Sequence, residues 1–122
     1  MNIKILVADD DMDNRTIAAE TLESSGYDVV LACNGLEAIE LAVSERPRVI
    51  LMDLSMPKLD GWQTVSRLKA MPGICDIPVI AFTAHAMTGD DRKAKLAGCN
   101  DYLTKPCEPK TMLKKVNEWC GL

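Results

Sequence analysis

The 122-residue sequence lacks the features that mark several large classes of protein. It contains no apolar run approaching the roughly 20 residues of a membrane-spanning helix, so we expect no insertion into a membrane. It has no basic stripe and a net charge of -4, which argues against direct binding to nucleic acid. The N-terminus shows no signal-peptide pattern, and we therefore expect a cytoplasmic protein.

Patterns for metal binding through cysteine or histidine are also scarce. The five cysteines are odd in number and form no CxxC pair, so a zinc site or a disulfide framework has little support. We expect small buried or half-buried thiols instead. His85 is the single histidine, and it cannot build a metal cluster or a catalytic triad alone. We expect it to be exposed in a loop.

Five strand-like segments alternate with five helix-like segments, without a repeat, a low-complexity tract or a linker. We expect one domain over residues 1–122. The strands are expected near residues 3–8, 28–32, 48–53, 78–82 and 101–104. Regular β-α alternation with short connections favours a parallel sheet with helices on both faces. Five strands allow the flavodoxin-like order, so the predicted fold is α/β with a five-stranded parallel sheet in the order 2-1-3-4-5.

Capping residues and apolar stripes place the five expected helices. They run from about residue 13 to Gly26, from Asn34, around residues 62–68, from Thr88 to Gly98, and from Pro109. Asn34 with Glu37 three residues later has the spacing of a capping box. Glycine is the usual residue just past a helix end, which supports the ends at Gly26 and Gly98.

Polar residues stand at the carboxyl ends of four of the expected strands. Asp53 ends an apolar run, and Asp9 and Asp10 follow the first strand. Thr83 follows the fourth strand, and Lys105 follows the fifth. Open α/β sheets bind ligands at the carboxyl ends of their strands, where these side chains are expected to converge. An acidic cluster, a hydroxyl and an ammonium suit a phosphate and a divalent cation.

Carboxylates gathered at one edge repel each other unless a cation neutralises them. Mg²⁺ suits such a site, because it prefers oxygen ligands and accepts one or two carboxylates while keeping several waters. Lys105 would balance a phosphoryl group or pair with Asp53, and Thr83 would donate a hydrogen bond to a phosphate oxygen. An aspartate in this setting can accept a phosphoryl group, since that transfer needs mainly orientation and charge neutralisation.

Four motifs, in this order, resemble the receiver domain of two-component response regulators over nearly the whole chain. They are LVADDD at residues 6–11, LMDLSMPKLDG at residues 51–61, FTA at residues 82–84 and YLTKP at residues 102–106. The resemblance implies that Asp53 takes a phosphoryl group from a histidine of a partner kinase or phosphotransfer domain. The segments around residues 83–87 and 98–102 look most like receivers attached to hybrid kinases or acting alone in relays.

The same resemblance implies roles for the neighbouring residues. Asp10 would be the principal Mg²⁺ ligand, with Asp9 close by and Asp53 also in the metal site. Ser55 would add its backbone carbonyl. Thr83 and Lys105 would hold the phosphoryl oxygens.

The implied output is signalling to another protein, with no enzymatic activity beyond self-phosphorylation and self-dephosphorylation. Tyr102 would change rotamer when Thr83 moves, and a downstream protein target would detect the change. Because the chain stops at Leu122, we expect no output domain. Partners would contact either the Asp53 site with the first helix, or the face formed by the fourth helix, fifth strand and fifth helix.

Two other interpretations remain open. In an EF-hand calcium loop, positions 1, 3, 5 and 12 would be Asp9, Asp11, Asp13 and Glu20. Asn14 then stands where that loop needs glycine. The spacing Asp9-x-Asp11 also fits the nucleophile motif of haloacid-dehalogenase-type phosphatases, which would leave Asp53 unexplained. Modification of Asp53 indicates a receiver, and modification of Asp9 indicates a phosphatase.

Overall fold

A five-stranded parallel sheet forms the centre of the protein. The computed structural model describes residues 3–53, 61–83, 98–104 and 107–121. The strands are β1 (Lys4–Ala8), β2 (Asp28–Ala32), β3 (Val49–Asp53), β4 (Val79–Thr83) and β5 (Asp101–Thr104). All neighbouring strands are parallel, and their order is β2-β1-β3-β4-β5. Both the strand positions and the predicted sheet order are confirmed.

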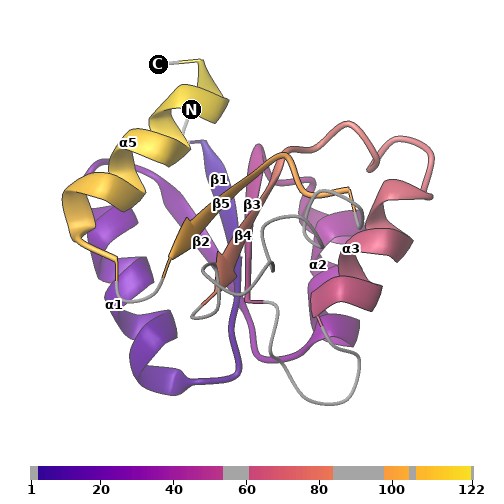
Figure 1. Cartoon of the computed structure of the whole chain (residues 1–122), viewed down its shortest axis with the longest axis horizontal. Helices are drawn as coiled ribbons and strands as arrows, with labels where there is room; N and C mark the ends of the chain where they lie inside the picture. The colour runs from indigo at the N-terminus through magenta and orange to yellow at the C-terminus, as the bar shows by residue number, and fades with distance from the viewer. Residues whose placement is uncertain (1–2, 54–60, 84–97, 105–106, 122) are drawn as a thin grey trace.

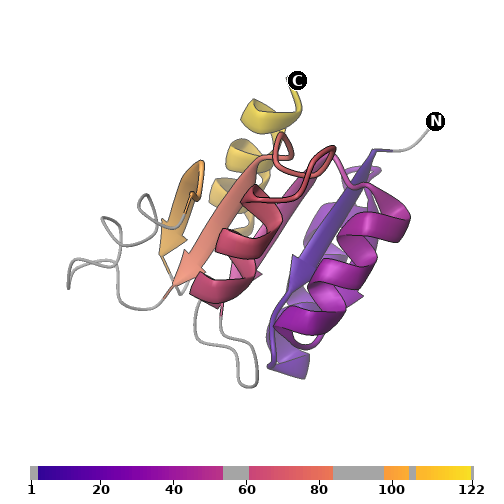
Figure 2. The same ribbon diagram turned by 90° about the vertical axis from the view of Figure 1, so that its right-hand side faces the viewer.

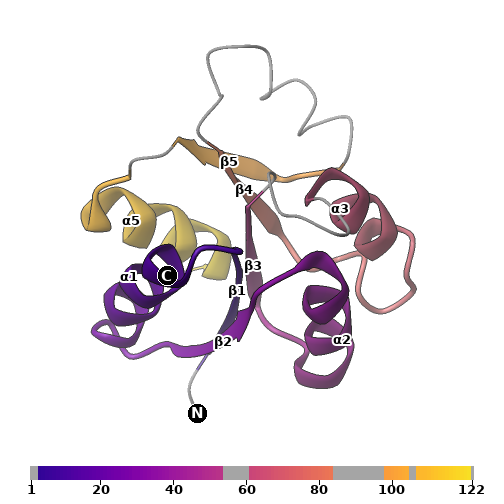
Figure 3. The ribbon, with the colours of Figure 1, turned by 90° about the horizontal axis from the view of Figure 1, so that it is seen from below.

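Helices cover both faces of this sheet. The described helices are α1 (Met12–Glu23), α2 (Gly35–Glu45), α3 (Gly61–Lys69) and α5 (Pro109–Cys120). Figures 1 and 3 show α1 and α5 on one face and α2 and α3 on the other, and Figure 2 looks onto the α2 and α3 side. The helix expected from Thr88 lies outside the described residues, except for Gly98 at its end. None of the described helices is long and apolar enough to cross a membrane.

The predicted cap of the second helix is present, and the helix start predicted at Thr88 lies outside the described residues. The Asn34 side chain accepts a hydrogen bond from the backbone N–H of Glu37 at 2.9 Å. The Glu37 carboxylate reaches back to the N–H of Cys33 at 3.0 Å, one residue before the helix cap. The predicted end of the first helix is Gly26, but the helix ends at Glu23. Gly26 has a φ of 91°, a left-handed conformation that glycine adopts without strain, and it closes the turn after the helix by donating its N–H to the Glu23 carbonyl at 3.0 Å.

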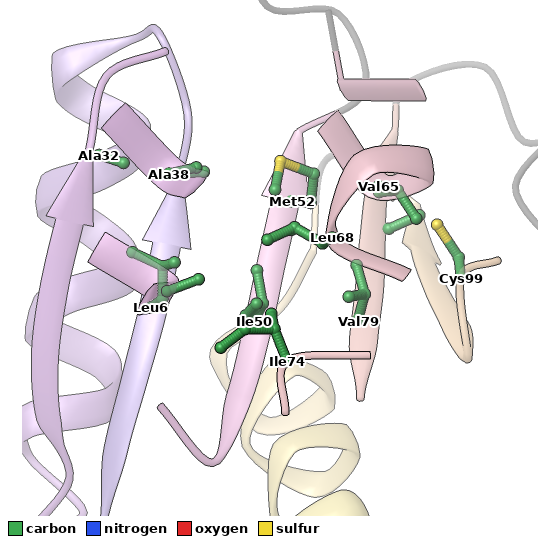
Figure 4. Close-up of a cluster of buried hydrophobic side chains, with 13 residues drawn as sticks. Leu6, Ala32, Ala38, Ile50, Met52, Val65, Leu68, Ile74, Val79 and Cys99 are labelled. Atoms are coloured by element: carbon green, nitrogen blue, oxygen red, sulfur yellow. The ribbon is translucent and has the colours of Figure 1, made fainter. Parts of the chain in front are cut away.

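Alternating strand residues divide the hydrophobic core into two clusters, one on each face of the sheet. Leu6, Ile50 and Met52 pack toward α2 and α3. Figure 4 shows Leu6 on the side of Ala38, and Met52 beside Leu68. The other cluster lies under α1 and α5. β3 is buried along its whole length, as its apolar run predicts. Each fully buried aliphatic side chain contributes roughly 1.5–3 kcal/mol, so the central strands are held firmly in place.

All five cysteines are free thiols, and four of them are buried or half-buried as expected. Cys33 differs, since it is exposed. The reason is its position, directly after the edge strand β2, where one side of the chain has no neighbouring strand. Burial raises the pKa of the Cys99 thiol to about 11, which keeps it protonated and unreactive.

Candidate functional site

The pairing of β1 with β3 brings the predicted carboxylates together. Ala8 lies opposite Met52 in the parallel register, so Asp9 and Asp53 follow side by side at the carboxyl edge. One carboxylate oxygen from each of Asp9, Asp10 and Asp53 lies within 4.8 Å of the others. Asp9 and Asp53 are each only 4% exposed, whereas Asp10 is exposed to solvent. The predicted convergence of these carboxylates is confirmed.

This acidic cluster has the donor chemistry of a site for a hard cation. Two ionised carboxylates at such a distance repel each other by roughly 3–4 kcal/mol at an effective dielectric constant of about 20. A divalent cation among them removes that repulsion, and carboxylate oxygens are the ligands that Mg²⁺ prefers. The exposed side of Asp10 leaves solvent access for the waters that Mg²⁺ retains. The three residues therefore fit Mg²⁺.

The junction between β1 and α1 is held by hydrogen bonds from its own residues. The Asp9 carboxylate accepts from the backbone N–H of Asp11 at 3.0 Å. The Asp11 carboxylate accepts from the N–H of Asn14 at 3.0 Å and caps α1. The Arg15 guanidinium donates to the backbone carbonyl of Asp9 at 2.8 Å. Sequence reasoning missed Arg15; the available signal was a basic residue in the first turns of a helix that follows an acidic cluster.

The other residues predicted for the site are only partly described. Thr83 is the last residue of β4, and Asp53 lies opposite Phe82, so the backbone of Thr83 reaches the same edge as the carboxylates. Tyr102 lies on β5, opposite Ala81, and is 36% exposed. Ser55 and Lys105 lie outside the described residues, so their predicted roles stay predictions, as does the predicted exposure of His85.

The EF-hand interpretation is wrong. Such a site needs a 12-residue loop that wraps around the ion. Here α1 begins at Met12, so Asp13 and Glu20 are helical and the segment cannot wrap around a cation. Asp11 serves as the cap of that helix.

Comparison with known proteins identifies relatives over nearly the full chain. A family profile described as the response regulator receiver domain matches residues 5–117. The polar-differentiation response regulator DivK of Brucella anthropi is 34% identical over 117 residues, which cover 96% of this chain and 95% of DivK. The sequence match therefore includes both the strands and the acidic cluster.

Solved structures agree with this result. The receiver domain of a Pseudomonas aeruginosa sensor histidine kinase is 34% identical, with a TM-score of 0.93 and complete coverage of both chains. That structure holds a magnesium ion in its active-site cleft. The chemotaxis response regulator CheY4 of Vibrio cholerae is 28% identical, with a TM-score of 0.92, covering 98% of this chain and 99% of its own. With its 2-1-3-4-5 parallel sheet, its acidic cluster and these relatives, the chain belongs to the response regulator receiver family.

Proposed function

We propose that this protein is a single-domain response regulator whose Asp53 accepts a phosphoryl group from the histidine of a kinase or phosphotransfer domain. The observation that carries the proposal is the acidic cluster of Asp9, Asp10 and Asp53, with oxygens within 4.8 Å of one another. The magnesium in the active-site cleft of the Pseudomonas aeruginosa receiver supports Mg²⁺ as the cation here. The family profile covers residues 5–117, which supports one receiver domain over residues 1–122.

In this proposal Asp53 is the nucleophile. Its carboxylate oxygen forms a bond to phosphorus while the phosphorus–nitrogen bond of the phosphohistidine breaks, and the imidazole leaves with the bonding electrons. Asp9, Asp10, Asp53 and the backbone carbonyl of Ser55 would hold Mg²⁺, which would supply neutralisation of the charge on the phosphoryl oxygens. A position at the end of a buried strand holds Asp53 in one place, which favours in-line transfer.

Two further residues contact the phosphoryl group in this proposal. Lys105 offers an ammonium and Thr83 a hydroxyl to its oxygens. Movement of Thr83 toward the phosphoryl group would open space for the Tyr102 ring, so phosphorylation would shift the population of two surface states. Because Tyr102 is 36% exposed, a downstream protein target could detect that shift. The protein would therefore act by signalling rather than by turning over a substrate.

The first helix offers a docking surface for the phosphate donor. Met12 is 66% exposed and Ile17 is 55% exposed, both large apolar side chains on the helix that starts beside the cluster. Single exposed apolar side chains are common on protein surfaces, so the position of this helix beside the cluster is the main support for the contact. We propose that the histidine domain contacts this helix while its phosphohistidine reaches Asp53.

Phosphorylation by a small donor tests the proposal. The protein and its Asp53→Asn variant are incubated with acetyl phosphate and Mg²⁺, with and without a chelator, and their intact masses are measured. We expect one phosphoryl group on the wild type, none on the variant, and none after chelation. Asp13→Asn, which changes an exposed acid on α1, is the matched control and should be labelled like the wild type. Labelling of Asp53→Asn at the wild-type level would exclude Asp53, and label on Asp9 would favour a phosphatase.

Transfer to histidine tests the relay. The phosphorylated protein, carrying a radiolabel, is mixed with histidine phosphotransfer domains from the same cell. Appearance of label on a histidine domain supports reversible transfer. If no histidine domain accepts the label and a target binds only the phosphorylated form, the protein is a terminal switch.

A further inference from the structure

We infer that Arg15 is a positioning residue for the acidic cluster, because its guanidinium holds the backbone between the metal-binding carboxylates and α1. The inference rests on the proposed function and adds a residue outside the motifs that identified the site. Arg15 is half-buried and lies in the first turns of α1. Its side chain reaches back six residues to the carbonyl of Asp9, at 2.8 Å.

The position of this hydrogen bond is at the end of the β1–β2 pairing. The last paired residues are Ala8 and Ala32, and the N–H of Asp9 still donates to the Ala32 carbonyl at 3.0 Å. β2 ends at Ala32, and beyond this point the segments that follow β1 and β2 are no longer paired. The guanidinium of Arg15 thus continues the support of the Asp9 backbone after the pairing of the two strands has stopped.

Arg15 also holds the other side of the turn. Its backbone N–H donates to the carbonyl of Asp11 at 3.0 Å, while its side chain holds the carbonyl of Asp9. Asp10 lies between these two carbonyls. Because the Asp10 side chain is exposed, the backbone on either side largely sets its direction. Arg15 therefore helps to orient the most accessible carboxylate of the cluster.

The choice of acceptor matters for the cation. A guanidinium bound to a main-chain carbonyl brings positive charge near the cluster without occupying the oxygens that Mg²⁺ needs. If Arg15 acts by positioning, removal of its guanidinium weakens Mg²⁺ binding. If Arg15 acts only through its charge, the removal tightens binding, since a nearby positive charge repels Mg²⁺. Positioning and charge repulsion therefore predict changes of opposite sign when the guanidinium is removed.

Two variants separate these possibilities. Arg15→Met removes the donor and the charge, and Arg15→Lys keeps the charge with a single ammonium. Lys114→Met removes the same charge from the exposed side of α5 and is the matched control. Magnesium affinity is measured by calorimetry on the unphosphorylated protein. Exchange of the Asp11 amide hydrogen, which is bonded to the Asp9 carboxylate, is measured without metal.

We expect Arg15→Met to weaken magnesium binding about tenfold, in line with the loss of an outer-shell contact at a metal site. The Asp11 amide should exchange faster in this variant, Arg15→Lys should recover part of both properties, and Lys114→Met should match the wild type. Tighter magnesium binding by Arg15→Met, or unchanged binding with only a lower unfolding temperature, would overturn the inference. If the wild type itself binds no magnesium, the proposed function fails and this inference fails with it.

Discussion

Polar side chains at the carboxyl ends of the strands (the carboxyl edge) are arranged differently from those at the amino ends of the strands (the amino edge). At the carboxyl edge, three groups of like charge, Asp9, Asp10 and Asp53, lie within 4.8 Å of one another. At the amino edge, polar side chains join elements by matching donors with acceptors. The ammonium of Lys69, at the end of α3, donates to the Ile77 carbonyl and to the Asn100 side chain, both at 2.8 Å.

Other contacts at the amino edge fasten α5 to the sheet. Asp101, the first residue of β5, accepts from Lys115 at 3.0 Å and from the Trp119 indole at 2.9 Å. Tyr27, just before β2, donates its hydroxyl to the side chain of Asn117 on α5. These matched donors and acceptors stabilise the amino edge.

The comparison shows that the carboxyl edge contains an arrangement of charges that is unfavourable for folding. Like charges held together reduce stability, and a ligand of opposite charge recovers it. Such local conflicts are expected at functional sites, whereas matched polar contacts are expected where an edge only holds the fold together. Mutations at the two edges should therefore change stability in opposite directions.

The largest effect is expected for Lys69→Met. The variant keeps the apolar stem that packs against Gly98 but removes the ammonium that bridges α3, the segment before β4 and the segment before β5. We expect a loss of about 2–3 kcal/mol in the free energy of unfolding, because hydrogen bonds from charged groups are the stronger ones. Urea denaturation measures it, with the exposed Lys114→Met as control. A loss no larger than in the control would remove Lys69 from the stabilising contacts of the amino edge.

Asp101→Asn should have the next largest effect, a loss of about 1–2 kcal/mol at neutral pH. Burial alone would raise the pKa of Asp101, but hydrogen bonds from Trp119, Lys115 and the Tyr102 N–H lower it below 3.8. Since the pKa in the folded protein is the lower one, the carboxylate stabilises the fold above about pH 4 and loses this effect as the pH falls through the folded-state pKa.

The difference between the wild type and Asp101→Asn should therefore shrink on acidification, and denaturation at several pH values measures it. Asp76→Asn changes an exposed acid and serves as the control. A pH-independent difference would show that the charge of Asp101 is unimportant.

At the carboxyl edge, Asp53→Asn should increase stability by about 1 kcal/mol in metal-free buffer, because it removes one of three like charges. With added Mg²⁺, the wild type should become more stable than the variant. At 100 times its dissociation constant, a ligand stabilises the protein that binds it by about 2.7 kcal/mol, and the variant binds Mg²⁺ more weakly. Thermal unfolding with and without Mg²⁺ measures both changes. A variant less stable than the wild type without metal would contradict the proposed repulsion.

Tyr27→Phe should have the smallest effect, a loss of about 0.5–1 kcal/mol, because it removes one neutral hydrogen bond and keeps the buried ring. Tyr102→Phe is the matched control, since Tyr102 is 36% exposed. Denaturation of both variants measures the difference. Equal stability of the two would show that the contact between Tyr27 and Asn117 adds nothing.

Much of the site could be predicted because its residues stand at strand ends that the sequence marks clearly. The apolar run before Asp53 and the run before Asp9 each identify a buried strand, and parallel strands bring their carboxyl ends to one edge. The predicted roles of Thr83, Lys105 and Ser55 rest on family motifs, and the experiments above are needed to test them.

Local patterns in the sequence determined the strands and the helix caps, because apolar periodicity and capping depend on residues only a few positions apart. Five strands only allowed the sheet order 2-1-3-4-5, which the pairing of distant strands decides. Contacts between distant residues were decided only by the tertiary structure. Lys69 and Asn100 are separated by 31 residues, and Tyr27 and Asn117 by 90. Packing and strand register set these two contacts, and no short stretch of sequence contains that information. The bond from Arg15 to the Asp9 carbonyl spans only six residues, but it still depends on how the chain turns from β1 into α1.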